Sequence, residues 1–300
     1  SEYGIFRVET NARVGGREEE DMYRQLGIRM YPPELREDRG EIELGLEGVI
    51  PDFVEVEDIH GDLHVHTDAS DGRASMRAMV LAARERGYEY VAITDHSVGR
   101  GIANGLTVER LREQIRQIRR LNDEIDGITI LAGSEVDIRR DGTLDFPVDV
   151  LAELDLCIGS IHSAFGLSED DQTARLLTVL DNPFLDIIAH PTGRLIGSRD
   201  PINLDMNRVL TAAAARGVAM EINSWPERLD LNDVHIMAAR ELGVPLVINT
   251  DAHAPDHYHL ILYGVAMARR GWATPKDILN TLPLKQLLPR LRRNAMRKAA

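Results

Sequence analysis

Cysteine is almost absent from this 300-residue sequence, which contains only Cys157. A single thiol excludes an intrachain disulfide framework and fits the reducing cytoplasm. Because Cys157 stands in the apolar run LDLCIG, we expect it to be buried as a small hydrophobic residue. The sequence also lacks an apolar run of the roughly 20 residues that a membrane helix needs, and it shows no signal-peptide pattern. These absences predict a cytoplasmic protein with no membrane partner. Because the chain begins with Ser1 rather than methionine, we expect a fragment or a processed protein.

Lysine is the second scarce residue, with three lysines beside 32 arginines. The net charge is −14, but its distribution is uneven. Residues 1–60 carry 16 acidic and 7 basic side chains, whereas residues 61–300 carry 33 and 28. Two or three divalent cations would roughly offset the small acidic excess of the second part. The charge therefore neither indicates nor excludes nucleic-acid binding.

Residues 1–50 differ from the rest of the chain. They are polar and acidic, are interrupted by glycine and proline pairs, and contain one clear short helix, predicted at 18–27 with its end at Gly27. They have too few apolar residues for a core of their own. We interpret them as the tail of a neighbouring domain, joined by a linker at 51–60 to a main domain at 61–300.

From Gly61 onward, short apolar runs of β type alternate with amphipathic helices. The β-type runs stand at 62–67, 90–96, 128–137, 154–162, 185–191, 218–224 and 245–253. Among the predicted helices, one begins after Ser75 and stops at Gly87, and another opens at Thr107. Further helices are predicted near 169–182, 205–216, 232–243 and 275–297. This alternation predicts an α/β protein with parallel strands and right-handed crossovers.

An open doubly wound sheet and a closed barrel both satisfy this alternation. Histidine, aspartate or glutamate residues stand at or just after the carboxyl ends of six of the seven predicted strands. An open sheet collects ligands at one switch point, whereas in a barrel all strand ends meet at one mouth. The sequence therefore favours a seven-stranded α/β barrel.

The residues at these strand ends are six histidines and three carboxylates: His64, His66, Asp71, His96, Glu135, His162, His190, Asp251 and His253. His64 and His66 are two positions apart on a strand, so both point to the same side. A single histidine at a strand end is more often structural than a ligand. Nine such residues at one mouth predict a metal site.

Imidazole and carboxylate groups together suit zinc, manganese or iron. Nine ligands are too many for one ion, so we expect two or three ions. Glu135 could bridge two of them about 3.5–4 Å apart. Such a site activates water and stabilises the attacking and leaving oxygens of a phosphoryl transfer. The pattern predicts a metal-dependent phosphoesterase.

These residues stand in the motifs HVHTDASDG, TDH, GSEVD, SIH, AHP and TDAH. In this order the motifs resemble those of the PHP (polymerase and histidinol phosphatase) superfamily, from residue 61 to about 285. The resemblance implies a distorted (β/α)7 barrel with a trinuclear metal centre. The ligand sets it implies are His64, His66, Glu135 and Asp251 for one ion, Glu135, His162 and His190 for the second, and Asp71, His96 and His253 for the third. It also implies an active enzyme whose catalytic residues are His64, His66, Glu135, His162, Asp251 and His253.

The beginning of the chain extends this resemblance. EYGIFR and LGIRMYPPELREDRGEIE (26–43) resemble the end of the polymerase region of bacterial family X DNA polymerases. HPTGRLIGSRDP (190–201) and EINSWPERLDL (221–231) resemble loops of the PHP domain of those enzymes. Residues 1–50 would then be a remnant of the polymerase thumb, without the nucleotidyl-transfer acids of the palm, so we expect no DNA synthesis. The resemblance implies a manganese-dependent 3′–5′ exonuclease that trims DNA ends in repair, with DNA and the upstream polymerase domain as partners, near the bacterial nucleoid.

Four more residues are candidates for substrate contacts. Arg194 and Arg199 follow His190 and suit a phosphate or the DNA backbone, although a solvated loop charge explains either one equally well. Asn223 and Arg228 supply polar groups on the sixth predicted strand and its loop, where no metal ligand stands.

Three other features have two interpretations each. Trp225 either packs or stacks on a base, and packing is favoured. His257 is either an acid near the mouth or a surface residue, and the surface is favoured. The basic residues of 285–300 either contact DNA phosphates or complement a helix dipole, which is the favoured reading.

Three alternative functions stay open. A small-molecule or 3′-phosphate phosphatase resembling histidinol phosphatase would have nearly the same site, but the thumb-like segment argues against it. A non-catalytic, metal-stabilised scaffold would not need the complete ligand set. An amidohydrolase also begins with an HxH motif on a barrel, but it uses a lysine ligand, and no lysine precedes Lys276.

Overall fold

The computed structural model describes residues 2–99, 103–292 and 294. The chain divides into two compact units, Ser1–Phe53 and Val54–Ala300. Among the described residues, no helix combines the length and the hydropathy that a bilayer span requires. Three of the basic residues expected near the end of the chain, Arg293, Arg297 and Lys298, lie outside the described residues.

The smaller unit is built from short elements. These are the antiparallel strands β1 (Ile5–Phe6) and β2 (Arg13–Gly15), followed by α1 (Glu19–Leu26) and α2 (Glu41–Glu47). Helix α1 confirms the helix predicted at 18–27. It begins with a capping box formed by Glu18 and Asp21, and it ends at Gly27, whose φ of 70° suits glycine. The hairpin was not predicted, because strands of two or three residues are too short to show a period of two.

The larger unit is a barrel of seven parallel strands, which confirms the predicted fold class. The strands are β3 (Gly61–Val65), β4 (Tyr90–Ile93), β5 (Thr129–Asp137), β6 (Leu156–Ser160), β7 (Ile187–Ile188), β8 (Ala219–Asn223) and β9 (Leu246–Asn249). Each strand is hydrogen-bonded to the next one in the chain. All the carboxyl ends therefore open on one side.

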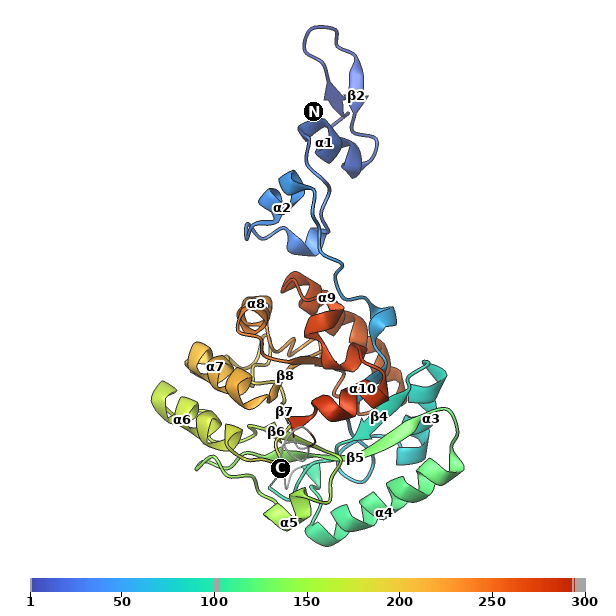
Figure 1. The fold of residues 1–300 in the computed structure, drawn as a ribbon, viewed down its shortest axis with the longest axis vertical. Helices are drawn as coiled ribbons and strands as arrows, with labels where there is room; N and C mark the ends of the chain where they lie inside the picture. The colour runs from blue at the N-terminus through green and yellow to red at the C-terminus, as the bar shows by residue number, and fades with distance from the viewer. Residues whose placement is uncertain (1, 100–102, 293, 295–300) are drawn as a thin grey trace. The chain divides into compact units, whose positions relative to one another are not determined.

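Helices surround these strands (Figure 1). They are α3 (Met76–Glu85), α4 (Val108–Glu124), α5 (Val148–Leu151), α6 (Glu169–Leu180), α7 (Met206–Arg216), α8 (Asp233–Glu241) and α9 (Ile261–Arg270). Ser75 and Thr107 cap α3 and α4 as predicted, because their side chains accept hydrogen bonds from backbone N–H groups of the first turn. Helix α9 was not predicted. It contains Gly264, where a Cβ atom would come within 2.1 Å of Ser224 Oγ, so this helix packs closely on the sheet.

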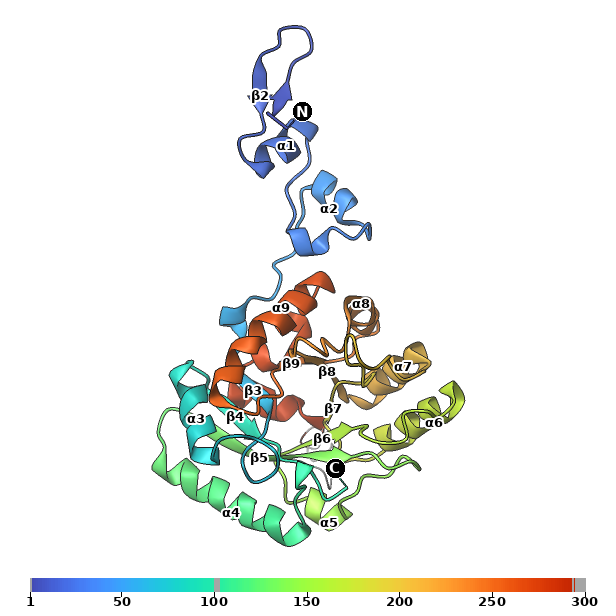
Figure 2. The same cartoon turned by 180° about the vertical axis from the view of Figure 1, so that it is seen from behind.

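The barrel closes between β3 and β9, which lie side by side in the view from behind (Figure 2). This seam has a single β-bridge, between Val65 and Ala252, instead of a regular ladder. His66 N–H donates to Ala252 O at 2.8 Å, and Leu63 N–H donates to Asn249 Oδ1 at 3.0 Å. The hydrogen bonds of an irregular seam thus come partly from side chains.

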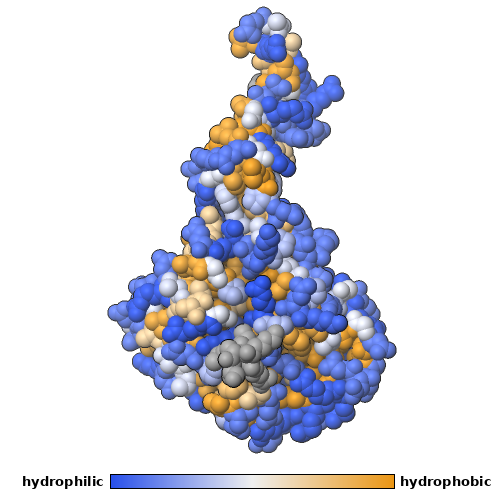
Figure 3. All heavy atoms as spheres, in the orientation of Figure 1, coloured by the Kyte–Doolittle hydropathy of each residue, from blue (hydrophilic) through white to orange (hydrophobic). Residues whose placement is uncertain are grey.

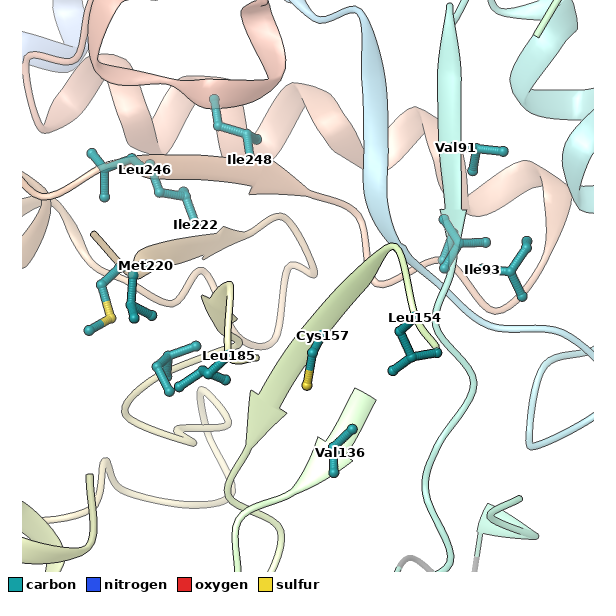
Figure 4. Packing of buried hydrophobic residues seen from close by; sticks show 14 of the residues in the cluster. Val91, Ile93, Val136, Leu154, Cys157, Leu185, Met220, Ile222, Leu246 and Ile248 are labelled. Carbon is teal, nitrogen blue, oxygen red and sulfur yellow. The ribbon is translucent and has the colours of Figure 1, made fainter. Parts of the chain in front are cut away.

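Alternate residues of the strands pack on opposite sides of the barrel wall. Cys157, Met220 and Ile248 belong to the cluster that includes residues of the surrounding helices (Figure 4). Ile158 and Val247 belong to the second cluster, which fills the barrel interior. Burial of Cys157 confirms the position expected for it. On the outside, hydrophilic residues cover most of the visible face of this unit (Figure 3).

The helix predicted at 275–297 is wrong for the described residues. This segment consists of 3₁₀ turns and one short helix, α10 (Leu284–Leu287), because Pro283 and Pro289 interrupt regular helix formation. Leu279 and Leu287 pack in the interior cluster. The segment therefore closes the end of the barrel opposite the mouth.

Asn280 joins this closing segment to the seam. Its Nδ2 donates to Gly61 O at 2.9 Å and to Ile248 O at 2.6 Å, and its Oδ1 accepts from Ile248 N–H at 3.0 Å. Asn280→Ala leaves these buried groups unpaired, so we expect it to lower the free energy of unfolding by about 2–4 kcal/mol. Urea unfolding of chelator-treated protein measures this loss. The control Asn207→Ala, on an exposed position of α7, should change it by less than about 0.5 kcal/mol. A loss as small as that of the control would contradict the role of Asn280.

Candidate metal centre

His64 and His66 lie at the carboxyl end of β3, and both side chains are fully buried. The pairing of β3 with β4 shifts register between Asp62 and Val65. As a result, the neighbours Leu63 and His64 both face the barrel interior, Leu63 within the apolar cluster and His64 at the mouth above it. The ring centroids of His64 and His66 are 5.1 Å apart. The predicted HxH pair is thus directed into the barrel.

All nine predicted ligands lie together at this mouth. Three groups of potential ligand atoms, each within 4.8 Å of one another, are formed by His66, Asp71, His96 and His253, by His64, His66 and Asp251, and by His96, Glu135 and His162. His190 joins them through Nε2, which lies 3.0 Å from Glu135 Oε1. The groups overlap with the three expected ligand sets but are not identical to them, because His66 and His96 each belong to two. The assignment of each residue to one ion stays a prediction.

Several buried atoms of this cluster make no hydrogen bond with any described residue. They are His64 Nε2, His66 Nδ1 and Nε2, His96 Nδ1, Glu135 Oε2 and His190 Nδ1. His96 Nδ1 lies 2.8 Å from Glu135 Oε2, but without the angles of a hydrogen bond. Unpaired buried polar atoms are costly and rare in folded proteins. Their concentration at one mouth, on nitrogen and oxygen donors, fits residues that bind divalent cations.

The charges of the cluster are strongly coupled. Burial alone would raise the pKa of Asp71, Glu135 and Asp251, but the surrounding histidine rings hold the pKa of all three below its ordinary value. Burial would lower the pKa of His96, but the charge of Glu135 and the carboxylate of Asp71 raise it to about 10. A divalent ion would compete with that proton for the ring nitrogen.

Burial prevails at two other rings. It lowers the pKa of His66 to about 4 and that of His190 to about 4. Both rings are therefore neutral at pH 7, which is the form of histidine that binds metals.

Two carboxylates behind the cluster were not predicted. Glu221 on β8 is fully buried, lies 2.7 Å from His64 Nδ1 and accepts a hydrogen bond from His190 N–H at 2.7 Å. Asp137 lies 2.6 Å from His162 Nδ1 through its Oδ1. Each stands two positions from a residue already considered, Glu221 before Asn223 and Asp137 after Glu135, so the period of two along a strand could have indicated them.

The four predicted substrate-contact residues have different surroundings. Arg228 is at the mouth, with Nε 3.6 Å from Asp251 Oδ2. Asn223 is also at the mouth but is fully buried, and its Nδ2 donates to Asp251 Oδ2 at 3.2 Å. Arg194 donates to the backbone carbonyls of Arg228 and Leu229. Asn223 and Arg194 thus support the cluster and the loop, and a contact of Arg228 with a substrate stays a prediction.

Arg199, the fourth candidate, lies beside the ring of Phe165, with 4.1 Å between its Cζ atom and the ring centroid. Its Nε donates to Gly193 O at 2.8 Å. The guanidinium is held against the loop, and its contact with a substrate stays a prediction.

A pocket of about 270 Å³ opens beside the cluster. Three of the predicted ligands, Asp71, Asp251 and His253, line one wall of this pocket. The rest of the lining is formed by Arg73, Leu195, Trp225, Glu227, Arg228 and His257. The pocket therefore places aromatic and cationic side chains next to a candidate metal site.

Comparison with known families gives two matches. The model described as PHP domain matches residues 62–224, and the model described as DNA polymerase beta thumb matches residues 1–37. The two matches fall on the larger and the smaller unit respectively.

Known relatives match along most of the chain. The sequence is 45% identical over 294 residues to a Bacillus subtilis protein named DNA polymerase/3′-5′ exonuclease PolX. The match covers 98% of this chain and 51% of that protein. The chain thus spans about half the length of this relative. It is 33% identical over 205 residues to a probable phosphatase of Caldanaerobacter subterraneus, covering 64% of this chain and 75% of that one. A probable phosphatase of Thermoanaerobacter sp. is 28% identical over 232 residues, covering 73% and 89%.

Among solved structures, the fold is similar to that of histidinol phosphate phosphatase from Lactococcus lactis, a structure described as a complex with zinc, L-histidinol and phosphate. The TM-score is 0.53 at 19% sequence identity, covering 71% of this chain and 94% of that one. This likeness supports the barrel fold.

Divalent ions should stabilise the protein, because they compensate the buried carboxylates of Glu135 and Asp251. An ion present at 100 times its dissociation constant adds about 2.7 kcal/mol. We therefore expect Mn²⁺ to raise the melting temperature of chelator-treated protein by about 5 °C or more. Scanning calorimetry with and without the ion measures the shift, and Glu135→Gln should lose most of it. Equal melting temperatures in both conditions would contradict a metal centre.

Glu221 should act on metal affinity through His64. Glu221→Gln keeps the shape of the side chain but weakens its hold on the ring, so we expect metal affinity to fall about 10–100-fold. Competition with a metal-indicator dye gives the dissociation constant. The control is Glu241→Gln, at the exposed end of α8, which should leave affinity unchanged. Equal affinities for the two variants would show that Glu221 has only a packing role.

Proposed function

This chain belongs to the PHP-domain family, and on that premise we propose that it is a metal-dependent phosphoesterase that acts as a 3′–5′ exonuclease on DNA ends. It would be the C-terminal part of a family X DNA polymerase of the bacterial cytoplasm. One observation carries the proposal: the likeness to a protein named polymerase and 3′-5′ exonuclease extends over 98% of the chain and includes the thumb match at residues 1–37. A barrel acting alone on small molecules would not need that segment.

The domain organisation follows from the same premise. Residues 1–50 are the end of the polymerase thumb, 51–60 are a linker, and 61–300 are the phosphoesterase domain. The partners of this chain are then DNA, as its substrate, and the upstream polymerase domain of the same protein. DNA synthesis would reside in that upstream domain.

The nine residues at the barrel mouth would hold two or three divalent ions. We propose manganese for activity, and zinc or iron suits the same mixture of imidazole and carboxylate ligands. Bound ions would supply Lewis acidity there, by polarising a phosphoryl oxygen and lowering the pKa of water.

The residues of the chain orient the site. Asp137 and Glu221 each accept the Nδ1–H of a histidine, which leaves Nε2 of His162 and His64 directed at the mouth. Arg228 lies beside Asp251, and its guanidinium would bind an oxygen of the phosphodiester. In the reaction, a water oxygen adds to phosphorus and the bond to the 3′ oxygen of the preceding nucleotide breaks. That oxygen takes up a proton, and a nucleoside 5′-monophosphate leaves.

A phosphatase that removes phosphate from small molecules or from 3′ ends is the second candidate. It is favoured by the relatives named probable phosphatases, one of which matches 73% of the chain. The metal ligands would be the same for both reactions, so substrate preference separates them.

The test is hydrolysis of a 5′-labelled single-stranded oligonucleotide in the presence of Mn²⁺. The native chain should produce a ladder of products shortened from the 3′ end. We expect His64→Ala and Glu135→Ala to lower the rate by more than about 100-fold, because loss of an outer-shell partner alone costs about 10–100-fold. The matched control is His60→Ala. His60 precedes β3, at the end of that strand away from the mouth, and its side chain is 42% exposed.

The outcomes are distinct. Cleavage of a simple phosphomonoester without a ladder would support the phosphatase and overturn the exonuclease. Metal binding without either activity would indicate that the domain is a metal-stabilised scaffold.

A further inference from the structure

The pocket beside the metal cluster is built from loops of four strands. It takes Asp71 and Arg73 from the loop after β3, Leu195 from the loop after β7, Trp225 and its neighbours from the loop after β8, and His257 from the segment after β9. Its volume of about 270 Å³ lies just below the range of about 300–1,000 Å³ that is typical of small-molecule sites. A space of this size suits one nucleoside and not a longer stretch of a strand.

Trp225 is held in place by its backbone. Its N–H donates to Asn223 Oδ1 at 3.0 Å, and its carbonyl accepts hydrogen bonds from the N–H groups of Arg228 at 2.8 Å and Leu229 at 3.0 Å. The side chain is partly exposed, and its indole N–H donates no hydrogen bond to a described residue. An aromatic ring on a backbone held in this way, at the edge of a pocket, offers a surface for stacking.

The neighbouring rings connect this surface to the metal cluster. His257 meets the indole at 70°, with ring centroids 4.8 Å apart, and its Nδ1 accepts a hydrogen bond from His253 N–H at 3.2 Å. His253, a predicted ligand, has its ring centroid 6.2 Å from that of Trp225. A flat group stacked on the indole would thus lie close to a predicted metal ligand.

The charges at the pocket suit a phosphate attached to that flat group. Arg228 is close to Asp251, on the side of the cluster. Arg73 is exposed at the rim, and its guanidinium forms no hydrogen bond or ion pair with a described residue. Both cations line the pocket together with Trp225, as do the acidic residues Asp71, Asp251 and Glu227. With ions bound at the carboxylates of the cluster, the two arginines would attract a phosphate.

We propose that the Trp225 pocket binds the terminal nucleotide of the substrate, with its base stacked on the indole and its 5′-phosphate directed toward the cluster by Arg228. This inference rests on the proposed nuclease function and adds a determinant of its substrate. Trp225 makes the enzyme prefer strands whose last nucleotide carries a base. Sequence reasoning favoured packing for Trp225, whereas its partial exposure beside the cluster favours stacking.

The first test measures binding without turnover. The chain has two tryptophans, so Trp272→Phe leaves Trp225 as the single tryptophan, whose fluorescence can be excited selectively over that of the tyrosines. Thymidine 5′-monophosphate should quench its fluorescence saturably, in chelator-treated protein and again with zinc, whereas 2-deoxyribose 5-phosphate, which lacks a base, should not. Trp225→Phe, which retains Trp272, is the matched control and should show no quenching. Equal quenching by both ligands, or quenching in the control, would overturn the proposal.

The second test measures turnover with Mn²⁺ on 5′-labelled oligonucleotides that end in either thymidine or an abasic deoxyribose. Stacking of a base on an aromatic ring corresponds to about a tenfold or larger effect on binding. We expect the native chain to show about tenfold higher kcat/KM on the thymidine end, mainly through KM. Trp225→Ala should remove this difference, Trp225→Phe should keep most of it, and Trp272→Phe should keep all of it. Because Trp225→Phe preserves an aromatic face, it separates loss of stacking from loss of folding.

The two proposals fail in different ways. Base-dependent quenching without any cleavage supports the pocket and overturns the nuclease. Cleavage that is equally fast on both ends, without quenching, overturns the pocket and leaves the nuclease in place.

Discussion

The rest of this structure depends on the interaction between the buried carboxylate of Glu135 and the histidines around it. Its oxygens lie within 3.5 Å of nitrogen atoms from five histidines: His64, His66, His96, His162 and His190. An isolated buried carboxylate would be very costly, so the fold must supply compensating groups around it. Those histidines come from four strands other than β5, which carries Glu135. Only a barrel in which the carboxyl ends converge meets that requirement.

The compensation continues outward from this centre. Glu221 and Asp137 lie behind His64 and His162, and Asn223 connects Glu221 with Asp251. These three residues lie behind the predicted ligands and leave the ligand atoms that face the mouth uncovered. The loops beyond the strands then determine what can approach those atoms. In the proposed function, the strands and the buried groups would serve metal binding, whereas the loops around Trp225 would serve recognition of the substrate.

Much of the fold could be predicted because parallel strands buried on both faces leave a strong apolar signal. Prediction failed where contacts between distant parts of the chain decide the structure. Gly264 weakens the helix signal of α9. A glycine is needed there because the helix approaches Ser224 closely, and this contact cannot be recognised from the neighbouring sequence. The segment at 275–297 has enough apolar residues for a helix, but they fill the barrel interior in short turns. Asn280 could not be identified at all, because its partners Gly61 and Ile248 are distant in the chain.

The sequence by itself determined the seven strands, the kinds of ligand and the strand ends on which they stand. These follow from apolar periodicity and from residue types that have few other reasons to recur at strand ends. Only the tertiary structure decided which ligands are neighbours, so that His66 and His96 each belong to two groups. It also decided that Asn223 supports the cluster from within and that Trp225 faces a pocket. The physical reason is that the orientation of His64 depends on the register shift in β3, and that of Asn223 and Trp225 on contacts between different strands and loops. Neither cause leaves a periodic signal along the chain.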